Sequence, residues 1–301
     1  MKQINYNEYF EQKVQALTDY VKKYNLKALI LGISGGIDST VCAAICHEVS
    51  KRIPVKVIGR SLPTEYNKEG ETASADLVGK AFCTDYKEVN IHKWYYESWY
   101  FNEHGSDHNA VAAGNIQARL RMIYLYNLAS IHRGIVIDTD NLTEHNLGYF
   151  TIHGDQGDVN PIGDLWKTQV FELANYIFYR YDAEARRIGA YYNPTNMIIT
   201  KLNAIKMSIS LKPTAGLGIT NNDLEEIGAE SYEQVDSILQ EILAWKRLAT
   251  ERKDLPEDLT KQREMFLDEQ QMLNIPIEII INVVNKHFAS EFKRKQMPIR
   301  L

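Results

Sequence analysis

The sequence has few of the features that mark secreted, membrane-embedded or nucleic-acid-binding proteins. It contains three cysteines in 301 residues, an odd number without C-x-x-C spacing, and we interpret Cys42 and Cys46 as small core residues. No apolar run approaches the roughly 18 residues of a membrane span, and the first residues form no apolar signal segment. A formal net charge of −5 argues against a polyanionic partner such as DNA or tRNA. These absences predict a cytoplasmic protein with neither nucleic-acid nor membrane partners.

Internal repeats, low-complexity segments and convincing domain linkers are also missing from the sequence. Hydrophobic residues make up 45% of the chain, which is enough for a substantial core. The sequence therefore predicts a single domain over residues 1–301. Within it we expect an α/β core at about 25–210 and a helical C-terminal part at about 220–301.

The most informative stretch is Ala28–Ser50. Its apolar run, Ala28–Ile33, predicts a buried parallel strand, and the segment S-G-G-I-D-S-T at 34–40 leads into apolar residues at helical spacing. A strand, a glycine turn and a helix start in that order form a backbone site for anions, because the free N–H groups of the first helical turn point at the loop. Gly35 and Gly36 lack a Cβ, so a phosphate can approach the main chain closely.

Asp38 is the unusual member of this loop. A carboxylate beside a phosphate repels it unless a cation lies between them, so the simplest role for Asp38 is a Mg²⁺ ligand. No lysine follows the second glycine, which excludes the G-x-x-x-x-G-K-[ST] loop of the common NTPases. The pattern S-G-G-x-D-S instead resembles the pyrophosphate loop of the N-type ATP pyrophosphatases. The competing interpretation is an ordinary strand-to-helix turn.

The rest of the chain alternates strands and helices. Pro54–Gly59 predicts a second strand with Arg60 at its carboxyl end, where open α/β sheets place their ligands. A helix at 73–82 and a strand near 86–91 complete a β-α-β-α-β run, which is typical of a doubly wound parallel sheet flanked by helices. A further strand, Gly134–Asp138, leads into a polar cluster at 139–144. Helices are expected at 9–24, 92–101, 111–131, 167–181, 231–245, 261–274 and 276–288, and loops around 148–166 and 211–223.

Seven segments in the same order resemble one family, the NAD synthetases. They are G-I-S-G-G-I-D-S, G-N-I-Q-A-R-L-R-M, T-x-N-x-x-E at 139–144, G-Y-F-T-x-x-G-D, P-I-G-D-L-W-K-T-Q-V, K-P-T-A-G-L and E-F-K-R-K. The resemblance covers nearly the whole chain. It implies a Rossmann-like fold and an ATP-dependent amidation of deamido-NAD (nicotinic acid adenine dinucleotide), with ammonia as the nitrogen donor.

The resemblance also implies roles for individual residues. Asp38 and Glu144 are expected to hold Mg²⁺, and Asp38, Lys167 and Asp158 to carry catalysis. Deamido-NAD is expected to contact Arg119, Asp155, Asp158 and Lys293. ATP is expected to contact Gly32, Ile33, Ser34, Gly35, Gly36, Ile37, Asp38, Ser39, Arg60, Thr139, Lys167 and Thr214.

The chemistry requires charge absorption and no protein nucleophile. The nicotinate carboxylate attacks the α-phosphorus of ATP, pyrophosphate leaves, and ammonia then displaces AMP. Lys167 and Arg60 are candidate charge absorbers, against the alternative of surface ion pairs. Asp155 and Asp158 are candidates to orient the pyridine ring or to take a proton from ammonium, against the alternative of turn residues. Arg119 is a candidate phosphate ligand, against simple surface solvation.

Two positions depart from the family pattern. Phe292 precedes Lys293 where the family often has histidine, and Ile152 replaces a lysine of the small ammonia-dependent enzymes. The family resemblance further implies a homodimer, and 301 residues leave no room for a glutaminase domain, so ammonia comes from free ammonium or from a separate amidotransferase. Two rival interpretations stay open: another ATP-pyrophosphatase ligase, and a non-catalytic nucleotide-binding relative.

Overall fold

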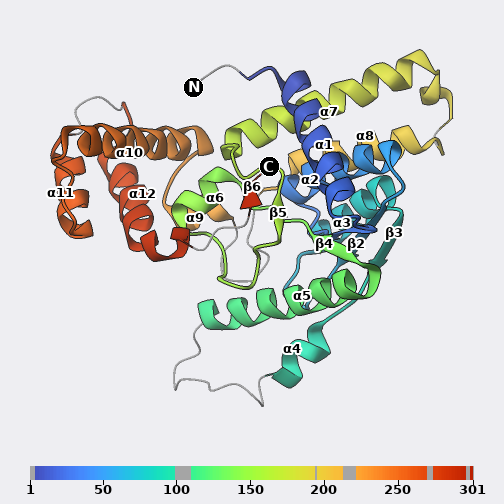
Figure 1. The fold of residues 1–301 in the computed structure, drawn as a ribbon, viewed down its shortest axis with the longest axis horizontal. Helices are drawn as coiled ribbons and strands as arrows, with labels where there is room; N and C mark the ends of the chain where they lie inside the picture. Colours follow the sequence, from blue (N-terminus) through green and yellow to red (C-terminus); the bar gives the residue numbers. More distant parts are fainter. Residues whose placement is uncertain are drawn as a thin grey trace.

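A parallel four-stranded sheet with the strand order β3-β2-β1-β4 lies at the centre of the fold. The computed structural model describes residues 4–98, 110–193, 195–212, 222–269, 274–295 and 299–300 (Figure 1). The strands are β1 (Ala28–Gly32), β2 (Lys56–Ser61), β3 (Asp85–Glu88) and β4 (Gly134–Val136). The predicted α/β fold with a parallel, helix-flanked sheet is confirmed.

Strand β1 is buried on both faces, as its continuous apolar run predicts. Because successive side chains point to opposite faces, Leu29 and Leu31 join the larger core, while Ala28 and Ile30 join a smaller one on the other face. Helices cover both sides of the sheet in Figure 1. The larger core is built with α1 (Tyr6–Lys23), α2 (Ile37–Arg52), α3 (Glu69–Phe82), α7 (Lys167–Arg187) and α8 (Met197–Ser210), and the smaller one with α4 (His92–Ser98) and α5 (Ala110–His132).

The C-terminal helices build a third core of their own around Val235, Ile242, Phe266 and Val283. Leu147 and Trp166 enter this core from the α/β part of the chain. None of the helices in the described ranges is long and apolar enough to cross a membrane. The third core packs residues of α6 (Leu142–Leu147), α9 (Asp223–Ile227), α10 (Tyr232–Arg252), α11 (Leu259–Glu269) and α12 (Ile277–Ala289), and the 3₁₀ turn Glu291–Lys295 follows α12.

Several elements of the fold are absent from the sequence-based expectation, among them the short helices α6 and α9 and the 3₁₀ turn Glu291–Lys295. Helix α8 and the short 3₁₀ turn Ala190–Tyr192 lie where no element was predicted. A second, two-stranded parallel sheet joins β5 (Val159–Asn160) to β6 (Ile299–Arg300), and a single bridge from Ile137 to Val159 connects it to the end of β4. The chain therefore returns at residue 299 to the carboxyl edge of the main sheet.

Candidate active site

A cavity of about 590 Å³ opens at the carboxyl ends of the parallel strands, within the size range of small-molecule sites. Its lining comes from both the α/β core and the C-terminal helices. It gathers most of the predicted residues, namely Gly32, Ile33, Ser34, Gly36, Ile37, Asp38, Ser39, Arg60, Thr139, Glu144, Asp155, Lys167 and Lys293.

The loop between β1 and α2 is shaped by Gly35, which has a φ of +82°, a backbone angle that residues with a side chain rarely adopt. A Cβ at this position would lie 2.5 Å from the carbonyl oxygen of Glu71 and 2.6 Å from the amide nitrogen of Ala75. The hydroxyl of Ser74 donates to the Gly35 carbonyl at 2.7 Å. The loop therefore rests directly on the backbone of α3, and only glycine fits.

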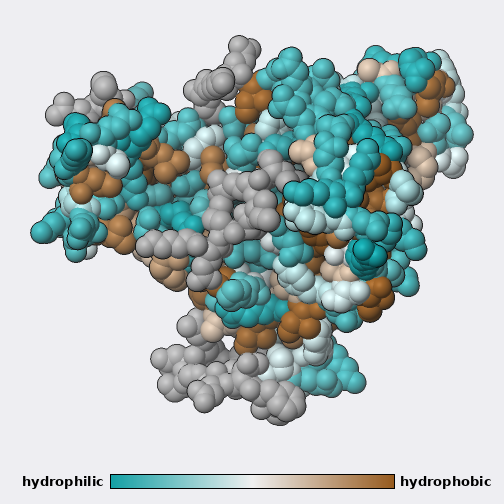
Figure 2. All heavy atoms as spheres, in the orientation of Figure 1, coloured by the Kyte–Doolittle hydropathy of each residue, from teal (hydrophilic) through white to brown (hydrophobic). Residues whose placement is uncertain are grey.

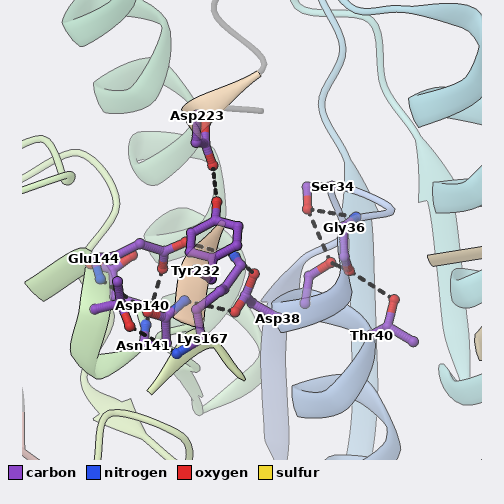
Figure 3. A network of polar contacts seen from close by, with 12 residues as sticks. Ser34, Gly36, Asp38, Thr40, Asp140, Asn141, Glu144, Lys167, Asp223 and Tyr232 are labelled. Carbon is purple, nitrogen blue, oxygen red and sulfur yellow. Dashed lines mark hydrogen bonds and ion pairs between the residues drawn. The ribbon is translucent and has the colours of Figure 1, made fainter. Parts of the chain in front are cut away.

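Hydroxyl groups surround the first turn of α2. Ser34 Oγ accepts from the Gly36 amide at 3.2 Å and lies 3.0 Å from Ser39 Oγ, while Thr40 Oγ1 donates to the Gly36 carbonyl at 2.8 Å (Figure 3). Gly36 is the N-cap of α2, so no cap side chain stands between the first helical amides and the cavity. This arrangement suits an anion such as a phosphate.

Lys167 lies between two carboxylates at the centre of the site. Its Nζ is 2.5 Å from Asp38 Oδ2 and 3.0 Å from Glu144 Oε1, and the residue is 1% exposed (Figure 3). It is the first residue of α7, and its Nζ lies 5.6 Å from the centre of the Tyr232 ring. Burial lowers the pKa of Lys167, but the charges of Asp38 and Glu144 outweigh this effect and raise it well above its ordinary value. The lysine is therefore a fixed cation.

Both carboxylates are held by Asn141, the buried N-cap of α6. Asn141 Oδ1 accepts from the Glu144 amide at 3.0 Å, and Glu144 Oε2 accepts from the Asn141 amide at 3.0 Å, which forms a capping box. Asn141 Nδ2 donates to Asp38 Oδ1 at 2.9 Å. Each carboxylate thus has one oxygen fixed by Asn141 and the other on Lys167.

The site carries more negative than positive charge. Burial raises the pKa of Glu144 to about 7, the charge of Lys167 opposes the rise, and Asp38 adds to it. Burial and then the neighbouring carboxylates raise the pKa of Asp140 well above its usual range. Asp140 lines the cavity next to Thr139. A bound cation would relieve this repulsion.

The donor chemistry fits a magnesium ion that is completed by substrate. Within the described ranges no group of three or more His, Cys, Asp or Glu side chains is arranged as a metal site. Mg²⁺, however, is usually bound by one or two carboxylates together with phosphates and water. Asp38 and Glu144 supply two carboxylates beside the phosphate-binding loop, so the residues present fit such an ion.

Another part of the cavity wall carries groups of mixed charge. Asp155 Oδ2 accepts from the Thr151 amide at 2.6 Å; burial raises the pKa of Asp155, while the Thr151 hydrogen bonds and the charges of Arg121 and Lys293 oppose the rise. Lys293 Nζ donates to the carbonyl oxygens of Gly148 at 2.7 Å and Phe150 at 2.8 Å. One acid and two cations therefore line this part of the cavity.

Four predicted residues lie outside the lining of this cavity or face away from it: Gly35, which rests on the backbone of α3, and three charged residues. Arg119 is exposed and its Nε donates to the Ile152 carbonyl at 3.3 Å. Asp158 accepts from Tyr126 Oη at 3.0 Å and from the Val136 amide at 2.9 Å, so it ties α5 to β4. The guanidinium of Arg60 is buried and turned toward β3, where Nη1 lies 3.1 Å from Asp85 Oδ1. Thr214 falls outside the described residues, and all these substrate contacts stay predictions.

Comparison with known proteins identifies the family. A family model described as NAD synthase matches residues 9–297. The chain is 31% identical over 301 residues to the NH(3)-dependent NAD(+) synthetase of Thermococcus sibiricus, an overlap of 99% of this chain and 98% of that protein. It is 32% identical over 235 residues to the corresponding protein of Thermoplasma volcanium, covering 77% of this chain and 84% of that one.

The chain belongs to the NAD synthase family. It is accordingly a ligase that forms a carbon–nitrogen bond and uses ATP as a substrate. Among solved structures, it is similar to the NMN synthetase of Francisella tularensis with a TM-score of 0.70 and 26% identity over 99% of both chains. The NH3-dependent NAD synthetase of Campylobacter jejuni, solved with a nitrate ion, shares the fold with a TM-score of 0.63 and 23% identity over 99% of this chain and 100% of that one.

Sequence reasoning did not single out three residues at the cavity of this NAD synthase fold. Asp140 lies inside the polar cluster 139–144. Its position as a carboxylate just after a predicted strand was the signal by which it could have been found. Arg121 lines the cavity, whereas the sequence-based assignment was Arg119. Asp223 also lines the cavity and accepts from Tyr232 Oη at 3.2 Å, while its other oxygen is buried without a hydrogen-bond partner in the described part of the chain.

Proposed function

We propose that the chain converts deamido-NAD to NAD by ATP-dependent amidation with ammonia. The carboxylate is first adenylated, and AMP and pyrophosphate are released. The observation that carries this proposal is the buried Lys167, held by Asp38 and Glu144 at the phosphate-binding loop. Membership of the NAD synthase family and the likeness to NH(3)-dependent NAD(+) synthetases support it.

The residues on the nucleotide side bind and neutralise phosphate. The first amides of α2 and the hydroxyls of Ser34 and Ser39 are placed to donate to phosphate oxygens. The ammonium of Lys167 is fixed beside them and stabilises the charge that develops as pyrophosphate leaves. No rearrangement of the lysine is required at that moment, because Asp38 and Glu144 already orient it.

We assign Mg²⁺ to Asp38 and Glu144, with Asp140 nearby. When bound, the ion supplies charge neutralisation between the carboxylates and the phosphates. Asn141 fixes one oxygen of each carboxylate and Lys167 contacts the other, so the two side chains that would hold the ion are already oriented. Burial raises the pKa of Glu144, and a divalent cation beside it would stabilise the charged carboxylate. This gives the site a local reason to bind such an ion.

On the acceptor side, Lys293 and Arg121 are suited to anionic groups of the pyridine nucleotide, and Asp155 is suited to the incoming ammonium. Asp155 is buried, and its raised pKa makes it a better proton acceptor than an ordinary aspartate. It thereby has the character needed to take a proton as ammonium becomes ammonia. Arg119 and Asp158 were also predicted here, and their contribution stays a prediction.

The function is tested by incubating the chain with ATP, Mg²⁺, ammonium and deamido-NAD. We expect NAD, AMP and pyrophosphate in equal amounts, and less NAD when glutamine replaces ammonium. AMP formation without NAD would instead identify another ATP-pyrophosphatase ligase. Nucleotide binding without any ATP cleavage would identify a non-catalytic relative. The comparison of ammonium with glutamine also decides whether a separate amidotransferase is needed.

A second candidate acceptor is the mononucleotide, which would make the product NMN. The observation that favours it is the TM-score of 0.70 to the Francisella NMN synthetase, against 0.63 and 0.62 to two proteins described as NAD synthetases. The two acceptors share the pyridine carboxylate and differ in the adenylate half. Measuring kcat/KM for deamido-NAD and for nicotinate mononucleotide on the same preparation separates the two functions.

We also propose that the chain forms a homodimer through the outer face of α5. Ile123, Tyr126 and Ile131 are 56%, 39% and 65% exposed, and the intervening exposed Asn127 and Ser130 carry no charge. Figure 2 shows hydrophobic residues over the part of the surface formed by α5. A large exposed apolar patch of this kind is typical of a protein–protein interface.

A further inference from the structure

A buried aspartate outside the cavity joins the C-terminal helices to the residues that hold Lys167. Asp236 lies on α10 and is 0% exposed. Its Oδ1 accepts from Thr143 Oγ1 at 2.5 Å, and its Oδ2 accepts from the Thr168 amide at 3.0 Å and from Thr168 Oγ1 at 2.8 Å. Three donors from two other elements thus converge on one carboxylate. It does not line the cavity.

The two threonines are the sequence neighbours of the central ion pair. Thr143 precedes Glu144 on α6, and Thr168 follows Lys167 on α7. Thr143 Oγ1 also accepts from the Lys167 amide at 2.8 Å. A continuous chain of hydrogen bonds therefore runs from the backbone of Lys167 through Thr143 to Asp236. This chain fixes the start of α7 against the first turn of α6.

Asp236 also caps the start of α7, which the side chain of the helix's own N-cap residue does not do. That residue is Trp166, whose side chain has no hydrogen-bond acceptor for a helical amide. A carboxylate at the second helical amide satisfies one of the unpaired donors and interacts favourably with the positive end of the helix dipole. The acid comes from a segment that is 68 residues away in the sequence.

We propose that Asp236 is a positioning residue that sets the separation of Lys167 from Glu144 and Asp38. This inference rests on the proposed function, because it gives a role to residues of the same site. Small errors in the placement of a charge-stabilising group reduce the rate of the chemical step far more than they reduce substrate binding. The alternative is a purely structural tie between the C-terminal helices and the α/β core.

Replacement of the carboxylate by an amide tests this role with little change of volume. In Asp236→Asn the negative charge is lost and one of the two oxygens becomes an NH₂ group, so Thr143 Oγ1 can no longer donate to that atom and the hydrogen-bond chain from Lys167 is weakened at its end. Thr143→Val breaks the same chain at its middle, and Thr143→Ser keeps the hydroxyl and serves as the conservative variant. Phe266→Leu is the matched control, since Phe266 is fully buried in the same C-terminal core and lies on α11, apart from the helices that carry the two threonines and Asp236.

We expect Asp236→Asn and Thr143→Val each to lower kcat by about 10–100-fold while KM for ATP changes by less than about threefold. The double variant is expected to lose no more than the worse single variant, because both break one chain. Thr143→Ser and Phe266→Leu should keep kcat near the wild-type value, even though Phe266→Leu lowers the thermal midpoint. A wild-type kcat in Asp236→Asn, or an equal loss of kcat in Phe266→Leu, would overturn the inference.

Hydrogen exchange separates this inference from the proposed function. The amides of Lys167 and Thr168 should exchange faster in Asp236→Asn than in wild type, and equally fast in Phe266→Leu and wild type. If the wild-type chain made no NAD, the proposed function would fail while the exchange result still tested the network. If the chain made NAD and exchange at these two amides did not change in Asp236→Asn, the positioning role alone would fail.

Discussion

Lys167 shows how a residue can be almost completely buried and still carry a charge. Moving an ammonium group out of water is costly, and the cost is offset here by Asp38 and Glu144 on opposite sides of Nζ. The arrangement has little conformational freedom, because Asn141 fixes the far oxygen of each partner. A cation that is prepared in this way can stabilise a leaving pyrophosphate without first having to be oriented.

Substitution of Lys167 by methionine removes the charge and keeps the apolar stem. We expect the single-turnover rate of adenylation to fall by about 10²–10³-fold, the magnitude reported for loss of one preorganised charge stabiliser. Lys13→Met is the matched control, because Lys13 is 6% exposed, pairs with Asp164 at 3.0 Å and does not line the cavity. The control should lose stability and keep its rate. Equal rates for both variants would contradict the role given to Lys167.

The sequence pointed to Asp38, Glu144 and Lys167 because they lie in motifs that resemble one family, and the structure brings the three side chains together. It assigned Arg119, whereas Arg121 lines the cavity; residues two apart point to nearly opposite sides of a helix, and α5 is apolar around much of its circumference, so the pattern did not show which side faces the site. Asp236 and Asp223 were beyond its reach for a different reason. Their partners Thr143 and Lys167 are far away in the sequence, and no local pattern encodes such contacts.

At the scale of elements, α12 and the 3₁₀ turn that follows it are fastened to the end of α6. His287 Nδ1 donates to the Asn146 carbonyl at 3.0 Å, and Arg294 Nη1 donates to the same oxygen at 3.0 Å. His287 is 1% exposed, and its Nε2 has no hydrogen-bond partner in the described part of the chain. Glu291 accepts from Lys246 and Arg294 beside it. The imidazole is therefore held neutral next to two cations.

The buried His287 predicts that the free energy of unfolding decreases in weak acid. Burial, and then the charges of Arg294 and Lys246, lower the pKa of His287 from 6.5 to about 3. The folded state prefers the neutral ring, so its contribution is complete above pH 6.5 and is lost as the pH falls toward 3. Between pH 7.5 and 5.5 we expect wild type to lose about 1 kcal/mol more unfolding free energy than His287→Gln, measured by urea denaturation.

An exposed histidine provides the comparison for that experiment. His153→Gln should follow the wild-type pH response, because His153 lies at the surface of the loop after α6. If His287→Gln lost as much unfolding free energy as wild type on acidification, the buried imidazole would not be the source of the pH dependence.

Element boundaries were largely predictable from the pattern of apolar residues. Strand β1 and helix α5 fall within one or two residues of their expected ends, because their apolar runs are long and their ends are marked by glycine or polar residues. Helix α8 was missed: its sequence M-I-I-T-K-L-N begins with β-branched residues that favour strands as much as helices. Strand β6 has only two residues and exists because it pairs with β5, which a local pattern cannot predict.

At the scale of the whole molecule, the cavity lies where the α/β core meets the C-terminal helices. Its wall includes Asp38 and Glu144 from the first part and Asp223, Lys286 and Lys293 from the second. The proposed single domain is consistent with this shared wall, since neither part encloses the site alone. The sequence predicted both parts by their element types, and the family resemblance pointed to a shared site through Lys293, but the contributions of Asp223 and Lys286 to the cavity were not predicted.

The homodimer is tested at this scale by a charge on the proposed interface. Ile123→Glu places a carboxylate on the outer face of α5, and we expect it to convert a dimer into a monomer in sedimentation velocity. Ile277→Glu is the matched control, since Ile277 is 55% exposed on α12 against 56% for Ile123, and it should remain dimeric. A wild-type chain that sediments as a monomer, or a dimer that survives Ile123→Glu, would contradict the assignment of this face.

The left-handed turn at Gly35 also limits how the gene can change. Every other amino acid that a mutated codon could specify has a Cβ, and that atom alone would clash with the main chain of α3. The rest of the side chain therefore makes no difference. Selection at position 35 consequently acts on the shape of the backbone and not on any property of a side chain. Descendants of this protein that replace the glycine must also move α3, and with it one wall of the nucleotide site.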